Sequence, residues 1–501
     1  MRRAAVVALA AAALAAPAVA QAADPAVYGV GVGQRSLNPG ADGLYNGEKV
    51  YLGGYGIGCC ESINEGRWAT GILDDPKGEL GHGLDVRAIA INDGKKTIVL
   101  ADATLQGWFT ADKDDANGIV DVRKRVEAAT GGAVKATDIV IQSDHSHSGP
   151  DLLGVWGGVP PAYQKYVADQ TEAAILDAIA DEKPSSLWYG VSDGTALLSN
   201  QFGGDPNNPN IDGEVRVLQA RTPGGGAVRH TMLDFSAHST VLGSQPFASG
   251  DWPQAINPMM EKAFGGDALT IVGTLGRTQP ADGNDCQGDE DTSKATNFCE
   301  LKTYADKLMP KISEAVDKAQ PLTGAPKVDS AGYYIQDPAT NGFLMALLYG
   351  GSNTGMPVHR ADSAPWLTGN LIGTSTTSMR IGDLLLSAGP GEMYPQIVQQ
   401  VRDNTPGLRG YMTAGLANDQ LGYLIAPLEA YPEPMATTAA ALANDNYAFN
   451  PSHTIGERVT CSLERGAGAV FGLGTAPRDA NPRCNAFVND TQYAAGSDTG
   501  G

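Results

Sequence analysis

The sequence predicts an α/β protein with a mixed β-sheet core covered by helices. Short apolar runs of strand length alternate with longer segments of helical spacing along most of the chain. Such alternation favours a mixed or mostly parallel sheet with helices on both faces. Ligand-type side chains also recur directly after several of the predicted strands. Because ligands in such folds bind beyond the carboxyl ends of the strands, the functional site is expected there.

The first half of the chain opens with a predicted β-hairpin. Residues 85–93 and 96–104 have strand character, and Asp93-Gly94 supplies the turn between them. Residues 118–130 then show the 3.6-residue spacing of a helix. A buried strand, a long amphipathic helix and three further strands follow, at 138–144, 162–182, 186–194, 214–221 and 228–239.

The second half continues the alternation. The spacing of apolar residues predicts a helix, a strand and a second helix, at 253–265, 269–276 and 298–319. Asp251 is expected to cap the first of these helices. A strand at 380–389 is expected to end at Gly389-Pro390-Gly391 and to lead directly into a helix at 392–403.

The N-terminus has the features of a secretory signal. Arg2 and Arg3 precede an Ala/Val/Leu run, which is followed by the small-residue stretch AVAQAADP. A basic segment, an apolar segment and an A-x-A-like site are typical of export, with cleavage after Ala20 or Ala22. An Ala-rich run this short suits a transmembrane anchor less well. We therefore expect residues 1–22 to be a signal peptide and the mature protein to be soluble, in an extracellular or periplasmic location.

Residues 23–485 are expected to form one large domain, followed by a polar tail at 486–501. No clear linker or internal repeat divides the chain, although its length would also allow several domains. The formal net charge is −21 at pH 7. A surface of this sign repels phosphate backbones and anionic lipids. Nucleic-acid binding and polybasic docking to membranes are therefore not expected.

The six cysteines suit an oxidising compartment. No C-x-x-C pair of the zinc-binding type is present, so disulfides are the better interpretation. Cys59 and Cys60 are adjacent; a bond between them would be strained, and either could pair elsewhere. Two further pairs are expected from proximity in the sequence, Cys286–Cys299 and Cys461–Cys484.

The stretch IVIQSDHSHSGPD places two histidines directly after a predicted strand. His145 and His147 are two residues apart, so their side chains share a face of an extended segment. His238 and Glu392 also follow apolar strands. Imidazoles and carboxylates are common zinc ligands, and a catalytic zinc keeps one position open for water. The second histidine of the pair could instead act outside the ligand set, as a proton donor.

Each of these residues also has a structural interpretation. A lone H-x-H is more often a pair of histidines satisfied by hydrogen bonds, and a carboxylate at a helix N-terminus, such as Glu392, stabilises the helix dipole. The recurrence of ligand-type residues at comparable strand ends favours a metal site over these interpretations. Of the other histidines, His82 is a possible fourth imidazole, and three are expected to be structural, namely His230, His359 and His453.

The ordered set of motifs resembles the secreted neutral ceramidases, which are zinc amidohydrolases that cleave the N-acyl bond of ceramide. SDHSHSGPD is similar to the family's HTHSGPGG signature, and SAGPGEMYP is similar to its PGE turn. Further family segments are matched, in the same order, by MLDFSAHSTVLG, ASGDWPQAINPMMEK and GLANDQLGYLIAPLEAY. The similarity spans roughly residues 26 to 440 and does not include the family's C-terminal immunoglobulin-like domain.

The resemblance implies a ceramidase-type zinc hydrolase catalytic domain over residues 23–485. By resemblance, the catalytic histidines would be His145, as a zinc ligand, and His147, as a proton donor outside the ligand set. The implied zinc ligands are His145, His238, Glu392 and Tyr423. The implied substrate is ceramide or a related lipid, cleaved into a fatty acid and an amine.

Three positions depart from the family's pattern around the substrate, and they are the expected substrate-binding residues. Gln279 stands where the family has a serine, and Gln201 where it has an arginine. Tyr431 is the nearest counterpart of a later active-site tyrosine. The metal ligands of the family are retained, whereas the residues that orient the substrate are changed. This combination favours a substrate that is different from ceramide, or a broader range of substrates. The alternatives are a zinc hydrolase for another N-acyl or ester compound, and a secreted metal-containing binding protein that has lost catalysis.

Overall fold

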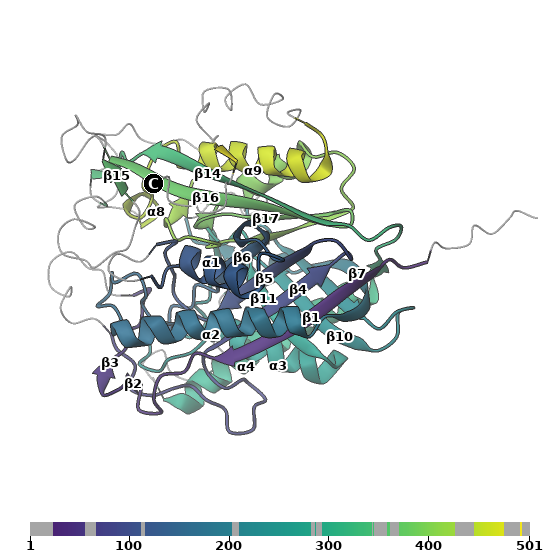
Figure 1. Ribbon diagram of the computed structural model, residues 1–501. Helices are drawn as coiled ribbons and strands as arrows, with labels where there is room; N and C mark the ends of the chain where they lie inside the picture. Colours follow the sequence, from purple (N-terminus) through teal and green to yellow (C-terminus); the bar gives the residue numbers. More distant parts are fainter. Residues whose placement is uncertain are drawn as a thin grey trace, which may run out of the picture.

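The computed structural model arranges the chain as two β-sheets with helices on their outer sides (Figure 1). The described residues are 24–55, 67–111, 116–202, 210–281, 286, 293–342, 344, 358–360, 370–425, 445–474 and 491–492. The predicted signal peptide at 1–22 lies outside the described residues, as do Cys59, Cys60 and Tyr431. What the sequence predicts for them stays a prediction.

The first sheet contains nine of the described strands. Their order is β11-β10-β9-β7-β1-β4-β5-β6, with β13 beside β7. The strands are β1 (Val27–Ser36), β4 (Asp85–Asn92), β5 (Thr97–Ala103), β6 (Ile139–Ser143), β7 (Lys183–Asp193), β9 (Glu214–Arg221), β10 (Val228–Phe235), β11 (Asp267–Val272) and β13 (Gln320–Pro321).

The length of each connection decides the direction of pairing in this sheet. Short turns join β4 to β5 and β9 to β10, and both pairs are antiparallel. The helices α1 (Ile119–Ala129) and α3 (Asp251–Phe264) join β5 to β6 and β10 to β11, and these pairs are parallel. Parallel neighbours need a crossover of this length, whereas a tight turn joins antiparallel neighbours. The sheet is therefore mixed, as predicted, but mostly antiparallel rather than mostly parallel.

The second sheet contains six of the described strands, in the order β19-β17-β16-β14-β21 with β15 beside β16. The prediction of a single strand at 380–389 is wrong. Gly382, whose φ is +62°, forms a turn that divides this segment between β16 and β17. Glycine adopts this left-handed conformation without a steric cost. The strands are β14 (Val328–Pro338), β15 (Val358–Arg360), β16 (Asn370–Ile381), β17 (Leu384–Ala388), β19 (Gly410–Ala414) and β21 (Thr491–Gln492), the last from the predicted tail.

Helices cover the outer face of each sheet, which gives four layers (Figure 1). Apolar side chains of both sheets meet in the centre, among them Tyr28, Leu218 and Leu386. The predicted mixed-sheet core covered by helices is confirmed, although each sheet carries helices on one face only. The first sheet is covered by α1, α2 (Pro161–Ala180), α3 and α4 (Lys294–Asp317), and the second by α6 (Pro395–Asp403) and α9 (Ile455–Phe471).

Short elements complete the described structure. Three two-strand pairs lie outside the main sheets, and one of them, β18 with β20, belongs to the candidate site. The short elements are β2 (Leu44–Tyr45), β3 (Glu48–Lys49), β8 (Leu198–Asn200), β12 (Thr278–Pro280), β18 (Glu392–Met393), β20 (Tyr423–Leu424), α8 (Asp445–Ala448) and the 3-10 helices Ala136–Asp138 and Thr195–Leu197.

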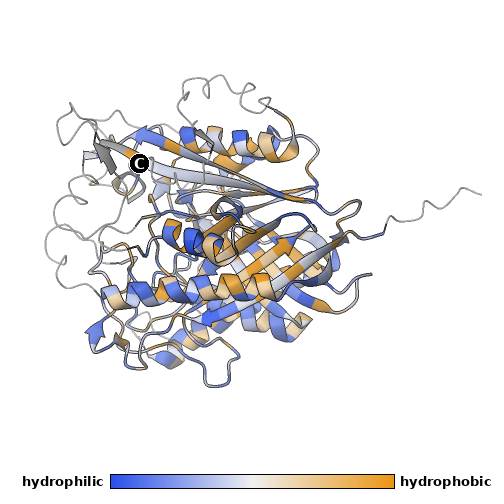
Figure 2. Cartoon of the chain, in the orientation of Figure 1, coloured by the Kyte–Doolittle hydropathy of each residue, from blue (hydrophilic) through white to orange (hydrophobic). Residues whose placement is uncertain are grey.

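Two glycines let α2 cross β1 at close range. A Cβ at Gly31 would lie 2.1 Å from the carbonyl oxygen of Ala178, and one at Gly33 would lie 2.1 Å from that of Ala174. The close crossing buries Ile175 completely against the sheet. Full burial of such a side chain stabilises the fold by about 1.5–3 kcal/mol. Figure 2 shows the result: the central strands are largely hydrophobic, whereas α2 carries polar residues along its outer side.

The predicted helices α1 to α4 are present in the structure. Two predictions about where a helix begins are wrong, one for the helix at 392–403 and one for the cap of α3. The helix predicted at 392–403 begins only at Pro395, because a residue before proline favours an extended backbone, so Glu392 does not sit at a helix N-terminus. Asp251 is the first residue of α3 rather than its cap. Its carboxylate instead accepts the backbone N–H groups of Val241 and Leu242, each at 3.0 Å.

The predicted disulfide between Cys286 and Cys299 is confirmed, with 6.0 Å between the two Cα atoms. Cys461 is also disulfide-bonded, and its expected partner, Cys484, lies outside the described residues. Within the described part of the chain, a helix with the length and apolarity to cross a bilayer is not found.

Candidate metal centre

Four of the predicted site residues meet where the two sheets come together. His145 and His147 follow β6, and His238 follows β10, so the first sheet supplies three imidazoles. Glu392 follows β17 of the second sheet, with only Gly389-Pro390-Gly391 between them. The strand-end prediction is therefore correct for these residues. His82, which the sequence offered separately as a possible fourth imidazole, lies at the surface instead and pairs with Asp74 at 2.8 Å.

The three imidazoles form one cluster. The ligand atoms of His145, His147 and His238 all lie within 4.8 Å of one another. Their ring centroids are 4.9 Å apart for His145 and His147, and 5.3 Å apart for His145 and His238. Spacings of this size allow the rings to share one cation.

Backbone carbonyls orient two of the three rings. His145 Nδ1 donates to the carbonyl oxygen of Gln106 at 2.7 Å, and His238 Nδ1 donates to that of Thr278 at 2.7 Å. Metal-binding histidines commonly donate their second nitrogen in this way, which fixes the tautomer and leaves the other nitrogen for the ion. The Nε2 atoms of both rings therefore point to the centre of the cluster.

Glu392 lies against these two Nε2 atoms. Its Oε1 is 3.5 Å from His145 Nε2, and its Oε2 is 3.0 Å from His238 Nε2. The short strand β18 pairs in parallel with β20, which places Glu392 directly opposite Tyr423. The hydroxyl of Tyr423 is hydrogen-bonded to the Glu392 carboxylate. Gly391 permits this pairing, since a Cβ there would lie 2.4 Å from the carbonyl oxygen of Gly422.

The backbone at His145 is in the left-handed region, with φ at +58°. A non-glycine residue in this region costs of the order of 1–3 kcal/mol. Asp144 holds the turn, because its Oδ1 accepts the backbone N–H groups of Leu105 at 3.1 Å and Ser146 at 3.2 Å. Both His145 and His147 therefore point to the same cluster because of this strained turn. The regular alternation of side chains along a strand is not the cause.

His147 differs from the other two imidazoles. Neither of its ring nitrogens has a hydrogen-bond partner in the described structure. Its ring is held by packing instead, at 4.9 Å from the Tyr55 ring and against Gly54, where a Cβ would lie 2.3 Å from the imidazole. Its main-chain carbonyl accepts a hydrogen bond from Arg67. His147 is thus positioned at the cluster by packing, and neither of its ring nitrogens is engaged by another described residue.

Burial sets the charge state of the cluster. Burial lowers the pKa of His145 to about 4, although the nearby Glu392 acts in the opposite direction. Burial also holds the pKa of His147 well below its usual value. For Glu392, burial would raise the pKa, but His145, His238 and Tyr423 outweigh it and lower the pKa. Neutral imidazoles beside an ionised carboxylate form a donor set that suits a divalent cation such as zinc.

The two glutamines that depart from the family pattern join Tyr423 in a hydrogen-bonded chain. Gln201 Nε2 donates to the Tyr423 hydroxyl at 2.9 Å. Gln279 Nε2 donates to Gln201 Oε1 at 2.5 Å, and Thr240 donates to Gln279 Oε1 at 2.5 Å. The short pair of β8 and β12 brings the glutamines together. The structure therefore places Gln201 against the phenol, with Gln279 one hydrogen bond further from it.

A cavity of about 120 Å³ opens beside the cluster. Its polar end is formed by His145, His147, Glu392 and Tyr423. Six apolar side chains form most of the remainder, namely Phe109, Leu153, Val155, Leu344, Leu421 and Phe449. Such a combination of apolar walls and a few convergent polar groups is typical of a small-molecule site.

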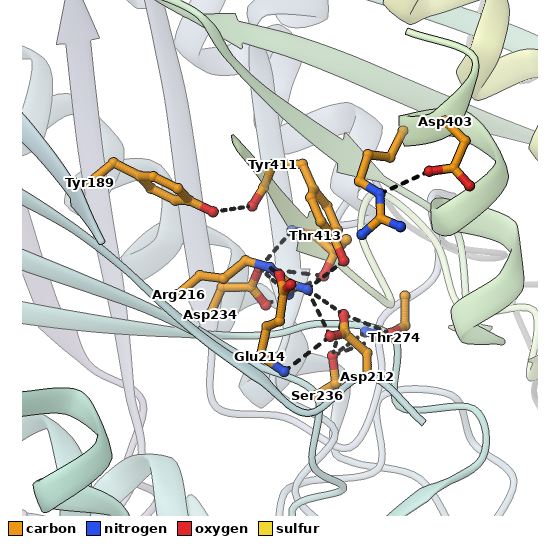
Figure 3. A network of polar contacts seen from close by, with 11 residues as sticks. Tyr189, Asp212, Glu214, Arg216, Asp234, Ser236, Thr274, Asp403, Tyr411 and Thr413 are labelled. Carbon is orange, nitrogen blue, oxygen red and sulfur yellow. Dashed lines mark hydrogen bonds and ion pairs between the residues drawn. The ribbon is translucent and has the colours of Figure 1, made fainter. Parts of the chain in front are cut away.

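A second buried polar cluster joins the two sheets (Figure 3). Arg216 on β9 donates to Asp212 at 2.7 Å and to the Tyr411 hydroxyl at 2.6 Å, and pairs with Asp234 at 3.2 Å. Asp234 on β10 accepts the backbone N–H of Thr413 on β19 at 2.9 Å. The Arg216 network therefore anchors β10, the strand that leads to His238, to the second sheet.

Several residues at the site were not found from the sequence. Gln106 and Thr278 orient the histidines through main-chain carbonyls, which carry no side-chain signal. Arg67 and Tyr55 come from an N-terminal loop far from the histidines in sequence. Gln420, which lines the cavity, lies within GLANDQLGYLIAPLEAY and could have been found from its position three residues before Tyr423.

Comparison with known proteins places the fold. No protein-family model matches the chain, and no curated protein matches it in sequence. The crystal structure of neutral ceramidase from Pseudomonas aeruginosa matches with a TM-score of 0.67 and 16% identity, over 94% of this chain and 78% of that chain. A structure described as ceramidase complexed with C2 also matches, with a TM-score of 0.67 and 17% identity, over 90% and 76% of the two chains. The expectation from the sequence motifs is therefore confirmed at the level of architecture: this chain has the fold of neutral ceramidase.

Proposed function

We propose that this chain is an exported zinc-dependent amidohydrolase that cleaves the N-acyl amide bond of ceramide or a related lipid. The observation that carries the proposal is the convergence of His145, His238, Glu392 and Tyr423 beside an unpartnered His147, at the polar end of an apolar cavity. The fold of neutral ceramidase supports it. Residues 23–485 would form the catalytic domain, and residues 1–22 the export signal.

In this proposal the metal ligands are His145, His238, Glu392 and Tyr423. A bound zinc would polarise the amide carbonyl and lower the pKa of coordinated water to about 7. Glu392 balances the charge of the ion, and the carbonyls of Gln106 and Thr278 keep the two ligand histidines in the tautomer that presents Nε2. Tyr423 is held on the opposite side by Gln201.

His147 is proposed to move the proton. An amide nitrogen leaves only when it is protonated, so a positioned acid contributes about 10²–10⁴-fold to the rate. With both ring nitrogens unengaged, His147 can accept a proton from the attacking water and return it to the departing nitrogen. The packing of Gly54 and Tyr55 against the ring fixes its position without occupying either nitrogen.

The two glutamines beside Tyr423 favour a ceramide-related substrate rather than ceramide alone. Gln201 and Gln279 are uncharged and bonded to each other, where the family pattern has an arginine and a serine. We propose that they bind the substrate close to Tyr423, and that Tyr431 contributes as the resemblance implies. An N-acyl or ester compound of another head group is the second candidate, favoured by this change of charge at the site.

The experiment is fatty-acid release from a long-chain ceramide by the mature protein. A chelator-treated sample and His145→Ala serve as controls. Release that is lost in both controls is the expected result. No release from ceramide or from other N-acyl and ester compounds, by a preparation that contains stoichiometric zinc, would contradict the proposal and favour a metal-containing binding protein.

A further inference from the structure

Arg67 joins three segments of the chain that surround His147. Its Nη1 donates to the main-chain carbonyl oxygen of Gln245 at 2.7 Å. Its Nη2 donates to the carbonyl oxygens of Gly53, at 2.9 Å, and of His147. Gly53 lies in the loop before β4, His147 in the turn after β6, and Gln245 in the loop between β10 and α3. One guanidinium therefore holds the His147 main chain against two other loops.

The main chain that carries Arg67 is itself fixed. The N–H of Leu52 donates to the carbonyl oxygen of Arg67 at 2.7 Å, and the N–H of Ala69 donates to that of Val50 at 2.8 Å. These two bonds tie the segment to the loop that contains Gly53. The side chain of Arg67 therefore reaches the histidine turn from an anchored base.

Arg67 also contacts the aromatic ring that packs against His147. Its Cζ lies over the Tyr55 ring, 5.2 Å from the centroid, and the Tyr55 ring lies 4.9 Å from the His147 ring with the two planes at 74°. A guanidinium is attracted to the face of an aromatic ring. Arg67 thus acts on His147 from two directions, on the main chain through the carbonyl oxygen and on the imidazole through Tyr55.

The other main-chain group of His147 is bound as well. Its N–H donates to the carbonyl oxygen of Ser239 at 3.0 Å, in the segment that follows β10. Both main-chain polar groups of His147 are therefore engaged, whereas neither ring nitrogen has a partner in the described structure. The contacts fix the place of the ring and leave its nitrogens unengaged.

The partners of Arg67 require a guanidinium. Three main-chain carbonyls in three loops accept from it, and a guanidinium offers five N–H groups in a rigid planar fork. An ammonium offers three donors around one point, so a lysine at this position would not match the spread of the three oxygens. Charge alone therefore does not explain the arginine at this position.

We propose that Arg67 is a positioning residue, which holds His147 in the orientation from which it transfers a proton. This inference rests on the proposed amidohydrolase function and adds to it a residue outside the proposed ligand set. The ligand histidines His145 and His238 are oriented by other carbonyl oxygens. Loss of Arg67 should therefore lower turnover without removing the ion, because misplacing a catalytic group by about 1 Å can cost about a hundredfold in rate.

The first experiment is a double-mutant cycle on the zinc-loaded mature protein, with fatty-acid release from a long-chain ceramide as the assay. Arg67→Ala should lower kcat by about a hundredfold, with KM within about twofold and the zinc retained. Arg67→Lys should be as slow as Arg67→Ala, because the fork and not the charge is needed. In the His147→Ala background, Arg67→Ala should change kcat by less than about twofold, since a positioning residue has no effect once the group it positions is removed.

A general loss of structure would instead multiply the two effects or release the zinc, and either result would overturn the inference. So would a kcat for Arg67→Ala within about threefold of that of the unsubstituted protein. Arg125→Ala is the matched control, which should leave kcat unchanged. Arg125 lies on α1 and also donates to a main-chain carbonyl, that of Ala116 at 3.1 Å, while pairing with Glu172 at 2.6 Å.

A second readout does not depend on turnover. Labelling of histidine with an NMR-active nitrogen isotope identifies the ring resonances of His147 as those that His147→Ala lacks. They should shift in Arg67→Ala and stay unchanged in Arg125→Ala. Unchanged His147 resonances in Arg67→Ala would overturn the inference whether or not the protein is active. Absence of hydrolysis of every N-acyl compound by the unsubstituted protein would contradict the proposed function instead.

Discussion

Two buried polar clusters are linked through β10, which carries Asp234 of one and leads to His238 of the other, and they differ in how completely they are satisfied. In the Arg216 network, the buried side-chain atoms of Arg216, Asp212, Asp234 and Tyr411 all have partners in the described structure. In the metal centre and its cavity, both ring nitrogens of His147 and the amide oxygens of Gln106 and Gln420 have none.

The difference separates a structural cluster from a functional one. A fully satisfied network in a medium of low dielectric constant is rigid and specifies one arrangement. A cluster with unpartnered groups is expected where a ligand, an ion or a reacting proton completes it. The Arg216 network therefore joins the two sheets, and the histidine cluster has the unpartnered groups that the proposed function requires.

The largest effect is expected from removing a metal ligand. His145→Ala deletes an imidazole whose orientation is set by Gln106, and the protein should lose stoichiometric zinc and all metal-dependent turnover. Metal content of the purified variant, measured by atomic emission, is the readout. Retention of one zinc per chain would remove His145 from the ligand set.

His147→Ala should separate catalysis from metal binding. The variant should retain zinc but lose about 10²–10⁴-fold in kcat, because the proposed function gives His147 the proton transfer and not a place among the metal ligands. Single-turnover kinetics together with metal analysis provide the test. Loss of the metal would instead indicate that His147 is the third imidazole ligand of the cluster. An unchanged kcat would show that His147 is not the proton donor.

Arg216→Met tests the satisfied cluster. Removing the guanidinium leaves Asp212 and Asp234 buried without their partner, which should lower the free energy of unfolding by about 3–5 kcal/mol. Denaturant unfolding of the metal-free protein measures it. A change below about 1 kcal/mol would mean that the network does not hold the sheets together as proposed. The matched comparison is His147→Ala, which should leave the stability of the metal-free protein nearly unchanged.

Substitution of His230 is expected to have the smallest effect, on the pH dependence of stability. It extends the comparison of satisfied and unpartnered buried groups to a histidine outside both clusters. It is buried, and neither ring nitrogen has a hydrogen-bond partner among the described residues, yet it lies on β10 outside the candidate metal centre. Burial lowers its pKa to about 3, from an ordinary value of 6.5. Below pH 6.5 this histidine is protonated in the unfolded chain, whereas in the folded protein it stays neutral until about pH 3. The free energy of unfolding therefore falls as the pH falls from 6.5 to 3.

The size of this contribution follows from the two pKa values. At pH 5 it amounts to about 2 kcal/mol of lost stability relative to pH 7. His230→Phe should abolish this part of the acid sensitivity, as measured by unfolding at pH 5 and pH 7. An unchanged pH dependence would show that His230 is protonated in the folded state. The result also tests whether an isolated unpartnered histidine is purely structural.

The sequence was informative where local pattern and chemistry coincide. Hydrophobic periodicity located the helices α1 to α4 and the hairpin of β4 and β5. The position at the end of a strand selected four residues, His145, His147, His238 and Glu392. A residue that follows a strand lies at the end of the sheet, where ligands bind, and this position can be located from the sequence without knowing which strands are neighbours. The ordered motifs indicated the fold of neutral ceramidase and Tyr423, which has no local signal of its own.

Only the tertiary structure decided how these pieces face one another. Which sheet faces which, and hence the four layers, depends on contacts between residues such as Leu218 and Leu386, which are distant in sequence. The pairing of β18 with β20 places Glu392 opposite Tyr423, and the surface position of His82 removes it as a fourth imidazole. The unpartnered oxygens of Gln106 and Gln420 are likewise invisible in sequence. Periodicity reports which side of an element is apolar, whereas hydrogen-bond satisfaction is a property of the whole packed chain.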